Sequence, residues 1–246
     1  MSAAFLVLVA GLGSLLATSD RLNPTQAQYL AWFWASLALP LGIAGLGIHW
    51  AACVVLVALA RLWCALLPRR SDMVGPRSVR TVGCGVAMVA GPALALGLDS
   101  ALVSGNAPLA GAWDTVRAPA LDAVPLELLV AGLGVVTLLG PASNRITSAM
   151  LTVVRSSDPG PEPASRPVLR GGRIIGPLER LLLLALGTVG AFPVIAALLA
   201  AKGIVRFPEI SLDSTLGSKA EEFLIGSLTS WSLACAGTLL LVASGS

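Results

Sequence analysis

Long runs of apolar residues separated by short polar segments dominate this chain. Six runs contain no charged residue: 2–19, 29–60, 81–98, 128–142, 181–201 and 223–246. Several of these runs reach the roughly 18–20 residues that a membrane-spanning helix needs. The pattern therefore predicts an all-α protein, a polytopic transmembrane helical bundle.

Turn residues and charges divide the runs into expected helices. The apolar stretch from Ala27 to Leu67 is too long for one span at about 1.5 Å per residue, and Pro40 and three nearby glycines favour two helices joined near 41–48. The helix that begins near Val124 is expected to continue past Pro141 as far as Arg155. The other expected elements are helices at 2–18, 81–98 and 220–242, a loop at 99–123 and a flexible Pro/Ser/Gly-rich linker at 156–167.

The run 181–201 has two possible interpretations. A single kinked span would cover about 31 Å, enough to cross a bilayer. Alternatively Gly187, Gly190 and Pro193 form a turn, which gives a hairpin of two helices near 174–190 and 191–206. The hairpin returns Lys202, Arg206 and Lys219 to the side that carries the other basic residues, so we favour it. The bundle then has about eight helices, and seven if 181–201 is one span.

Three regions follow from this division. Residues 1–140 are expected to form an N-terminal transmembrane scaffold, residues 141–173 a cytoplasmic linker, and residues 174–246 a C-terminal transmembrane segment with the charged motif. No basic residue precedes the first apolar run, which favours a first membrane helix over a cleaved signal peptide, although Ala17-Thr-Ser19 resembles a cleavage site.

The distribution of arginine and lysine orients the expected bundle. Loop 68–80 carries four of these residues, loop 145–173 carries five, and loop 99–123 carries one. Positively charged loops remain on the cytoplasmic side, so 68–80 and 145–173 are expected to be cytoplasmic in a multi-pass protein of the cell (inner or plasma) membrane.

Composition narrows the chemistry further. The chain is 56% apolar and 12% charged, against roughly 45–50% and 25% in soluble proteins. No basic stripe with aromatic platforms is present, so nucleic-acid binding has no support. Cys53, Cys64, Cys84 and Cys235 lack metal-ligand spacing and are expected to be small core residues. We predict no metal site and no cofactor.

Charged residues at the two ends of 181–201 are the best candidate site. With a turn between Gly190 and Ala191, Glu179 and Lys202 lie equally far from the turn and therefore at the same depth on adjacent helices. A pair there would offset the cost of burying either charge in lipid. The expected cluster at this membrane face consists of Glu179, Arg180, Lys202, Arg206, Glu209, Glu221 and Glu222.

A structural explanation competes with a functional one. Glu179, Glu221 and Glu222 fall near helix starts and Lys202 near a helix end, positions that the helix dipole favours without any ligand. His49, the single histidine, and Trp32, Trp34, Trp50, Trp63 and Trp113 are typical of interface anchors. Ala196, Ala197, Ala200 and Ala201 would permit close helix contact.

Four segments carry a resemblance. Asn144-Arg-Ile-Thr, Gly172-Arg-Ile-Ile-Gly-Pro-Leu-Glu-Arg180, Ala200-Ala-Lys-Gly-Ile-Val-Arg-Phe207 and Glu221-Glu-Phe-Leu-Ile-Gly-Ser-Leu-Thr-Ser230 occur in this order. Together they resemble the motifs of an uncharacterised family of bacterial integral membrane proteins, over about residues 136–240. The resemblance implies a shared membrane domain and no assigned activity. Relatives carry His and Asp patterns in their first half that this chain lacks, so metal-dependent hydrolysis is not expected here.

These observations favour a non-enzymatic membrane protein that binds or passes a small anionic solute, ion or lipid head group, or that serves as membrane subunit of an assembly. Expected partners are membrane lipids, with a possible homo-oligomer or protein assembly. One alternative is a membrane-embedded enzyme on a lipid-linked or phosphorylated substrate, with Glu179 or Glu222 as general base and Arg180, Lys202 or Arg206 holding phosphate. The other is a purely structural interaction partner.

Overall fold

A computed structural model describes residues 1–17, 24–67, 77–103, 106–116, 124–157, 172–211 and 218–245. The secondary structure of these residues is helical, apart from an isolated bridge between Ile48 and Val103. The elements are α1 (Ser2–Ala17), α2 (Pro24–Pro40), the π-helical turn η1 (Leu41–Gly45), α3 (Trp50–Leu66), α4 (Arg77–Gly97), α5 (Asp99–Leu102), α6 (Pro108–Val116), α7 (Leu126–Thr137), the π-helical turn η4 (Leu138–Ala142), α8 (Ser143–Ser157), α9 (Gly172–Thr188), α10 (Phe192–Ser211) and α11 (Ser218–Gly245). The expected all-α class is confirmed.

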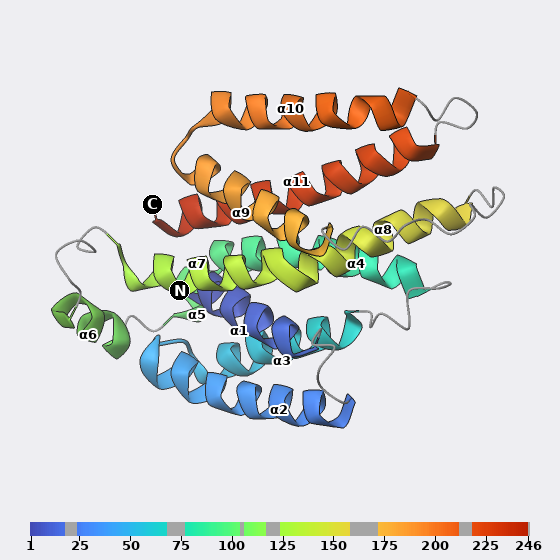
Figure 1. Ribbon diagram of the computed structural model, residues 1–246. Helices are drawn as coiled ribbons and strands as arrows, with labels where there is room; N and C mark the ends of the chain where they lie inside the picture. The colour runs from blue at the N-terminus through green and yellow to red at the C-terminus, as the bar shows by residue number, and fades with distance from the viewer. Residues whose placement is uncertain are drawn as a thin grey trace.

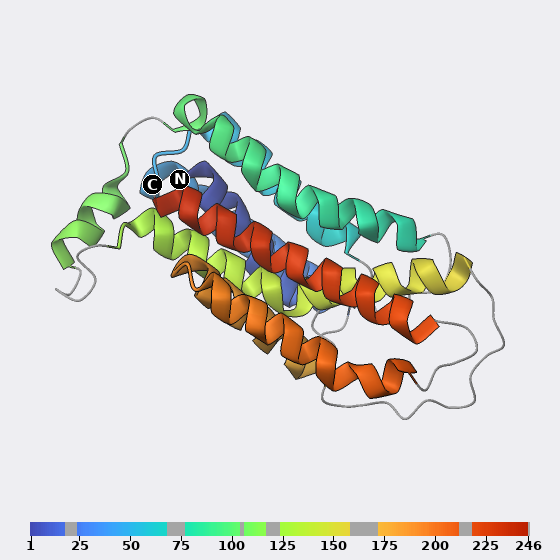
Figure 2. The same cartoon turned by 90° about the horizontal axis from the view of Figure 1, so that it is seen from above.

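The long helices run back and forth between two ends of an elongated bundle (Figure 1). Helix α1 lies in the middle against α7, with α2 and α3 on one side and α9, α10 and α11 on the other. Turned by 90°, the molecule shows α4 beside α11 on the face opposite α10 (Figure 2). Both the start of α1 and the end of α11 lie at the end of the bundle that carries α5 and α6.

The core forms around α1, the most deeply buried helix. Its side chains from Ala3 to Val9 are nearly inaccessible, and they join a cluster that includes Leu138 and Leu139 of η4 and Leu233 of α11. The expected N-terminal scaffold and the C-terminal segment thus contribute to the same core.

Glycine allows α1 and α7 to pack at very short range. A Cβ atom on Gly134 would lie 2.6 Å from the backbone nitrogen of Leu8, and one on Gly11 would lie 2.7 Å from the carbonyl oxygen of Gly134. Small residues that bring two backbones together are a common basis of helix association in lipid. The pair Gly11 and Gly134 therefore sets the distance between the two central helices.

A break divides the helix that the sequence predicts to continue past Pro141. Gly140 has non-helical backbone angles (φ −78°, ψ −114°) and Pro141 has no N–H to donate. Hydrogen bonding at the break is consequently irregular. The carbonyl oxygen of Leu138 in η4 accepts from the backbone N–H of Ser143 and also from its hydroxyl, the latter at 2.8 Å.

The chain from Gly172 to Ser211 is a helical hairpin, as favoured from the sequence. Helix α9 ends at Thr188, and α10 starts at Phe192 after a turn in which Gly190 has φ +70°. Residues other than glycine rarely adopt this backbone conformation. The alternative of one continuous helix through 181–201 is wrong.

Two helices are long and apolar enough to cross a membrane, namely 126–152 and 220–245 of the described chain. The first of these contains the break at Gly140. Four shorter apolar helices accompany them, at Ser2–Ala17, Tyr29–Gly45, Trp50–Leu66 and Gly85–Gly97.

The expected loops need correction. The segment 99–123 contains the short helices α5 and α6, which lack the long apolar runs that the hydropathy pattern detects. Helix α8, which ends at Ser157, confirms the expected helical continuation to Arg155, while the Pro-rich part 158–171 of the expected linker lies outside the described residues. Residues 68–76 of the expected basic loop also lie outside them, and Arg77 and Arg80 belong to α4.

The close contact of α1 and α7 predicts a specific glycine requirement. Gly134→Ala should lower the free energy of unfolding by about 1–3 kcal/mol, because the new methyl group meets backbone that cannot move aside. Gly132→Ala is the matched control, since a Cβ there meets nothing within 4 Å and alanine favours the helix. Thermal or denaturant unfolding in detergent measures both. Equal stability of the two variants would contradict the packing.

Candidate functional site

Glu179 and Lys202 form an ion pair between the two helices of the hairpin. The Lys202 Nζ atom lies 2.6 Å from both carboxylate oxygens of Glu179. The side chains are 13% exposed for Glu179 and 29% for Lys202, so the pair is partly buried and the ammonium is its more accessible half. The structure thus contains the contact that equal spacing from the turn predicts.

Helix α11 completes the surroundings of this pair. The Trp231 Nε1–H donates to Glu179 Oε1 at 3.0 Å. The Lys202 ammonium also lies 5.5 Å from the centre of the Trp231 ring and 5.9 Å from that of Phe223. Aromatic rings attract a cation through the negative charge of their faces. Three helices therefore meet at the Glu179–Lys202 pair.

Arg180 takes a different direction from its neighbour. It is 2% exposed, and its guanidinium donates to Ser230 Oγ at 2.8 Å, Asn144 Oδ1 at 2.8 Å and Thr147 Oγ1 at 3.3 Å. The expectation that Arg180 gathers with the other charges at the membrane face is wrong. Successive helix residues lie about 100° apart, so Glu179 faces α10 while Arg180 enters the core.

The guanidinium of Arg180 also donates a hydrogen bond to the backbone at the break between α7 and α8. Arg180 Nη1 donates to the carbonyl oxygen of Leu139 at 3.1 Å, beside the hydroxyl of Ser143 on Leu138. Buried carbonyl groups without partners are costly, and a positively charged donor is among the strongest partners available. Arg180 therefore stabilises the irregular helix segment at η4.

The charges of the three central side chains do not cancel. Both oxygens of Glu179 are engaged by Lys202, and the four acceptors of Arg180 are all neutral. Glu179, Arg180 and Lys202 together thus carry one net positive charge, with Arg180 buried among neutral polar acceptors and Lys202 partly exposed. A partly buried positive charge attracts a nearby anion more strongly than an exposed one does, because a lower dielectric strengthens the attraction.

The remaining predicted residues lie toward the outer end of the cluster. Arg206 is exposed on α10, one turn beyond Lys202. Glu221 is exposed in the first turn of α11 and Glu222 is half-buried beside it, close to Phe223. The side chain of Glu209 lies outside the described residues.

Sequence reasoning did not select the neutral partners of Arg180. Asn144, Thr147 and Ser230 belong to segments that carry the family resemblance, and Trp231 directly follows the last of them. The structure brings these segments together at Glu179, Arg180 and Lys202. The four segments thus contained the side-chain partners of Arg180, but their positions in the sequence did not show that these residues meet. Only the packing of the helices shows it.

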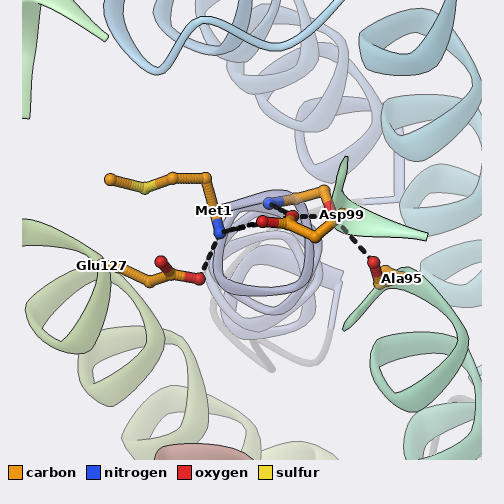
Figure 3. A network of polar contacts seen from close by, with 5 residues as sticks. Met1, Ala95, Asp99 and Glu127 are labelled. Carbon is orange, nitrogen blue, oxygen red and sulfur yellow. Dashed lines mark hydrogen bonds and ion pairs between the residues drawn. The ribbon is translucent and has the colours of Figure 1, made fainter. Parts of the chain in front are cut away.

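A second polar cluster lies at the opposite end of the bundle (Figure 3). The ammonium group of Met1 donates to Asp99 at 3.2 Å and also contacts Glu127. The Ser2 backbone N–H donates to Asp99 at 2.7 Å, and its hydroxyl bonds to Asp99 and to the carbonyl oxygen of Ala95. These contacts join α1 to α5 and α7.

Opposing effects act on the Asp99 carboxyl group. Burial raises its pKa, but the two hydrogen bonds from Ser2 and the positive charge of the Met1 ammonium lower it more. The net result is a pKa below the ordinary value of 3.8. The charged form of Asp99 is therefore favoured in the folded protein.

Other sequence candidates occupy structural positions. His49 is exposed and precedes α3, with its backbone N–H bonded to Leu102. Trp32 and Trp50 are exposed, as interface anchors would be, but Trp63 is buried in the core. Cys53 and Cys64 are buried as expected, whereas Cys235 is exposed. The alanine face of α10 is exposed and does not form the close helix contact that it would permit.

Comparisons with protein-family models, with curated proteins and with solved structures find no match for this chain. The described residues themselves show the class: an all-helical protein with two helices long and apolar enough to cross a membrane and with an intramolecular charge cluster.

Replacement of Arg180 tests its structural role. Arg180→Met should lower the free energy of unfolding by about 1–3 kcal/mol, because Asn144 and the Leu139 carbonyl lose their charged donor. Arg61→Met is the control, since Arg61 stacks on Trp32 and its Nε has no partner. We expect Arg61→Met to lower the free energy of unfolding by less than Arg180→Met does. An equal loss measured by thermal unfolding would contradict a special role for Arg180.

The Asp99 contacts predict a pH dependence. A lowered carboxyl pKa adds stability above about the ordinary value, and this stability is lost as the pH falls through the folded-state pKa. Asp99→Asn should therefore lower the melting temperature at neutral pH and weaken its decrease on acidification. Asp114→Asn, at an exposed position of α6, is the charge-matched control. Identical pH profiles for Asp99→Asn and the unaltered protein would contradict the assignment.

Proposed function

We propose that this chain is a polytopic integral membrane protein without enzymatic activity that binds a small anion or an anionic head group at Lys202. The ligand group is a phosphate or carboxylate, carried by a solute or by a lipid. The observation that carries the proposal is the partly exposed Lys202 ammonium beside the buried Arg180, since Glu179 balances only one of these two positive charges.

The outer surface of the bundle supports a membrane location. Large apolar side chains are exposed on the outward faces of several helices, including Phe33 of α2, Leu62 of α3, Leu182 of α9, Val205 of α10 and Leu239 of α11. Soluble proteins rarely expose apolar surface on this scale. Eight helical segments would then cross the bilayer: α1, α2, α3, α4, α7–α8, α9, α10 and α11.

The ends of the bundle support the proposed orientation. The end of α3, the start of α4 and the end of α8 lie at one end of the bundle, and Arg77 and Arg80 of α4 and Arg155 of α8 belong to these helix ends. Asp99 and Glu127 lie at the other. By the positive-inside rule the first end is cytoplasmic. Glu179 lies seven residues after the start of α9, and Lys202 lies nine residues before the end of α10.

The break at Gly140 fits a binding protein better than a passive scaffold. In membrane transporters, interrupted helices provide backbone groups and half-helix ends at the sites that hold ions and substrates. Here the interruption adjoins Arg180, whose neighbour Glu179 holds Lys202. The charged pair and the irregular backbone thus belong to one continuous network.

A structural clamp is the second candidate. The specific observation in its favour is that Lys202 and Trp231 already satisfy the carboxylate of Glu179, which ties α9, α10 and α11 together. In that case the pair stabilises the hairpin and binds nothing else.

Opposite charge changes separate these two candidates. In neutral detergent, inorganic phosphate should raise the melting temperature of the unaltered protein, since a ligand that binds only the folded state at 100 times its Kd adds about 2.7 kcal/mol. Lys202→Met should abolish this response. Glu179→Gln should keep or strengthen it, because the ammonium is released from its carboxylate.

The controls identify the source of the anion and the alternative. Arg61→Met removes a positive charge elsewhere and should leave the response unchanged. Micelles containing phosphatidylglycerol in place of phosphate test a lipid head group. If neither anion stabilises the protein, and Lys202→Met and Glu179→Gln destabilise it equally, the structural clamp is correct and anion binding is wrong.

A further inference from the structure

The charged cluster lies on one side of α11, and the other side borders an apolar groove. The groove lies between α11 and α4, with residues of α1, α7 and η4 as its floor. Its volume is about 490 Å³, and it is open along one side. Pockets of this size, roughly 300–1,000 Å³, are typical of small-molecule sites.

The chemistry of the groove excludes polar ligands. One wall is formed by Met88, Pro92 and Leu96 of α4, and the other by residues of α11 that include Cys235 and Leu239. The floor consists of valine and leucine side chains. Ser232 is the single hydroxyl in the lining. A ligand here would find no charged partner and almost no hydrogen bond, so its bound part must be hydrocarbon.

The length of the groove suits a segment of a hydrocarbon chain. The lining extends over residues 88–96 of α4 and 232–243 of α11, which correspond to about 12–16 Å along the helix axes. A flexible chain can follow a groove of this length between two helices and contact its apolar walls on both sides.

The lining area argues against a second protein as the occupant of the groove. The accessible surface of the groove is far smaller than the roughly 800 Å² per partner that a stable interface buries. Exposed apolar side chains adjoin the groove on both helices, represented by Val86 of α4, one turn before the lining residue Val89, and by Leu228 of α11, one turn before the lining residue Ser232. On the proposed membrane location, bilayer lipid covers these side chains.

We propose that the groove between α4 and α11 binds one acyl chain of a bilayer phospholipid as a defined site. This inference rests on the proposed membrane location and does not depend on anion binding at Lys202. Relative to the bilayer, the groove offers close packing against fixed side chains, so its occupant exchanges more slowly than ordinary surrounding lipid.

A photoreactive lipid tests the site. The protein is reconstituted in phosphatidylcholine nanodiscs containing a small fraction of phosphatidylcholine with a diazirine in one acyl chain, then irradiated, and the labelled peptides are mapped. We expect labelling to concentrate on 88–96 and 232–243, several-fold above the exposed apolar faces of α9 and α10. Uniform labelling of all outward faces would show ordinary bilayer contact only and overturn the proposal.

Two phenylalanine variants on one helix provide the matched comparison. Ala93 lines the groove, whereas Ala90 is exposed on α4 outside the lining. Ala93→Phe fills the groove and should reduce labelling of 232–243 several-fold, while Ala90→Phe should not. Equal labelling in both variants would overturn the proposal. Ala236→Phe repeats the test from α11 if Ala93→Phe does not fold.

Failure of this inference is distinguishable from failure of the proposed function. Release of the chain from membranes by alkaline carbonate would overturn the membrane location, and with it the acyl-chain occupant. Loss of the phosphate response alone would leave the labelling pattern unchanged. Lys202 lies across α11 from the groove, so the Lys202→Met protein should give the same labelling pattern as the unaltered protein.

Discussion

The contact between Arg180 and the broken helix is the constraint on which the C-terminal half of the structure depends. Gly140 and Pro141 interrupt the helix between Leu126 and Ser157 at a buried position in the bundle, where the Leu139 carbonyl oxygen needs a donor from the protein. The guanidinium of Arg180 reaches the Leu139 carbonyl and the first turn of α8 at once. A neutral side chain could not provide this number of donors in a fixed plane. The break and the buried arginine are therefore two parts of one arrangement.

This arrangement fixes the orientation of α9 and, through it, of α10. Once Arg180 is held in the core, Glu179 must face the neighbouring helix of the hairpin, where Lys202 lies at the same depth. Helix α11 follows the same logic with two adjacent residues, since Ser230 bonds Arg180 and Trp231 bonds Glu179. Helix α10 has an exposed outer face, so its place depends strongly on this one ion pair.

The predictable and unpredictable parts of the site differ in their physical basis. The hairpin and the Glu179–Lys202 pair follow from local counting about Gly190, because the turn fixes the register of two adjacent helices. The position of Arg180 does not follow, because its partners are neutral groups on α7–α8 and α11 whose packing no local pattern encodes. The all-helical class was evident from the apolar runs. The helices α5 and α6 were missed because they are short, and buried Trp63 because composition alone cannot distinguish the core from an interface.

Helix α11 separates two surfaces of opposite character. Its Ser230 and Trp231 bind the charged network, and the next residues, from Ser232 onward, line the apolar groove. Leu139 connects the two surfaces directly, since its carbonyl oxygen accepts from Arg180 while its side chain forms part of the groove floor. This side chain is fully buried, so it cannot move without disturbing the core around α1. An acyl chain in the groove and an anion at Lys202 would thus both act on η4. The two binding events can be energetically coupled only if the break at η4 has two arrangements.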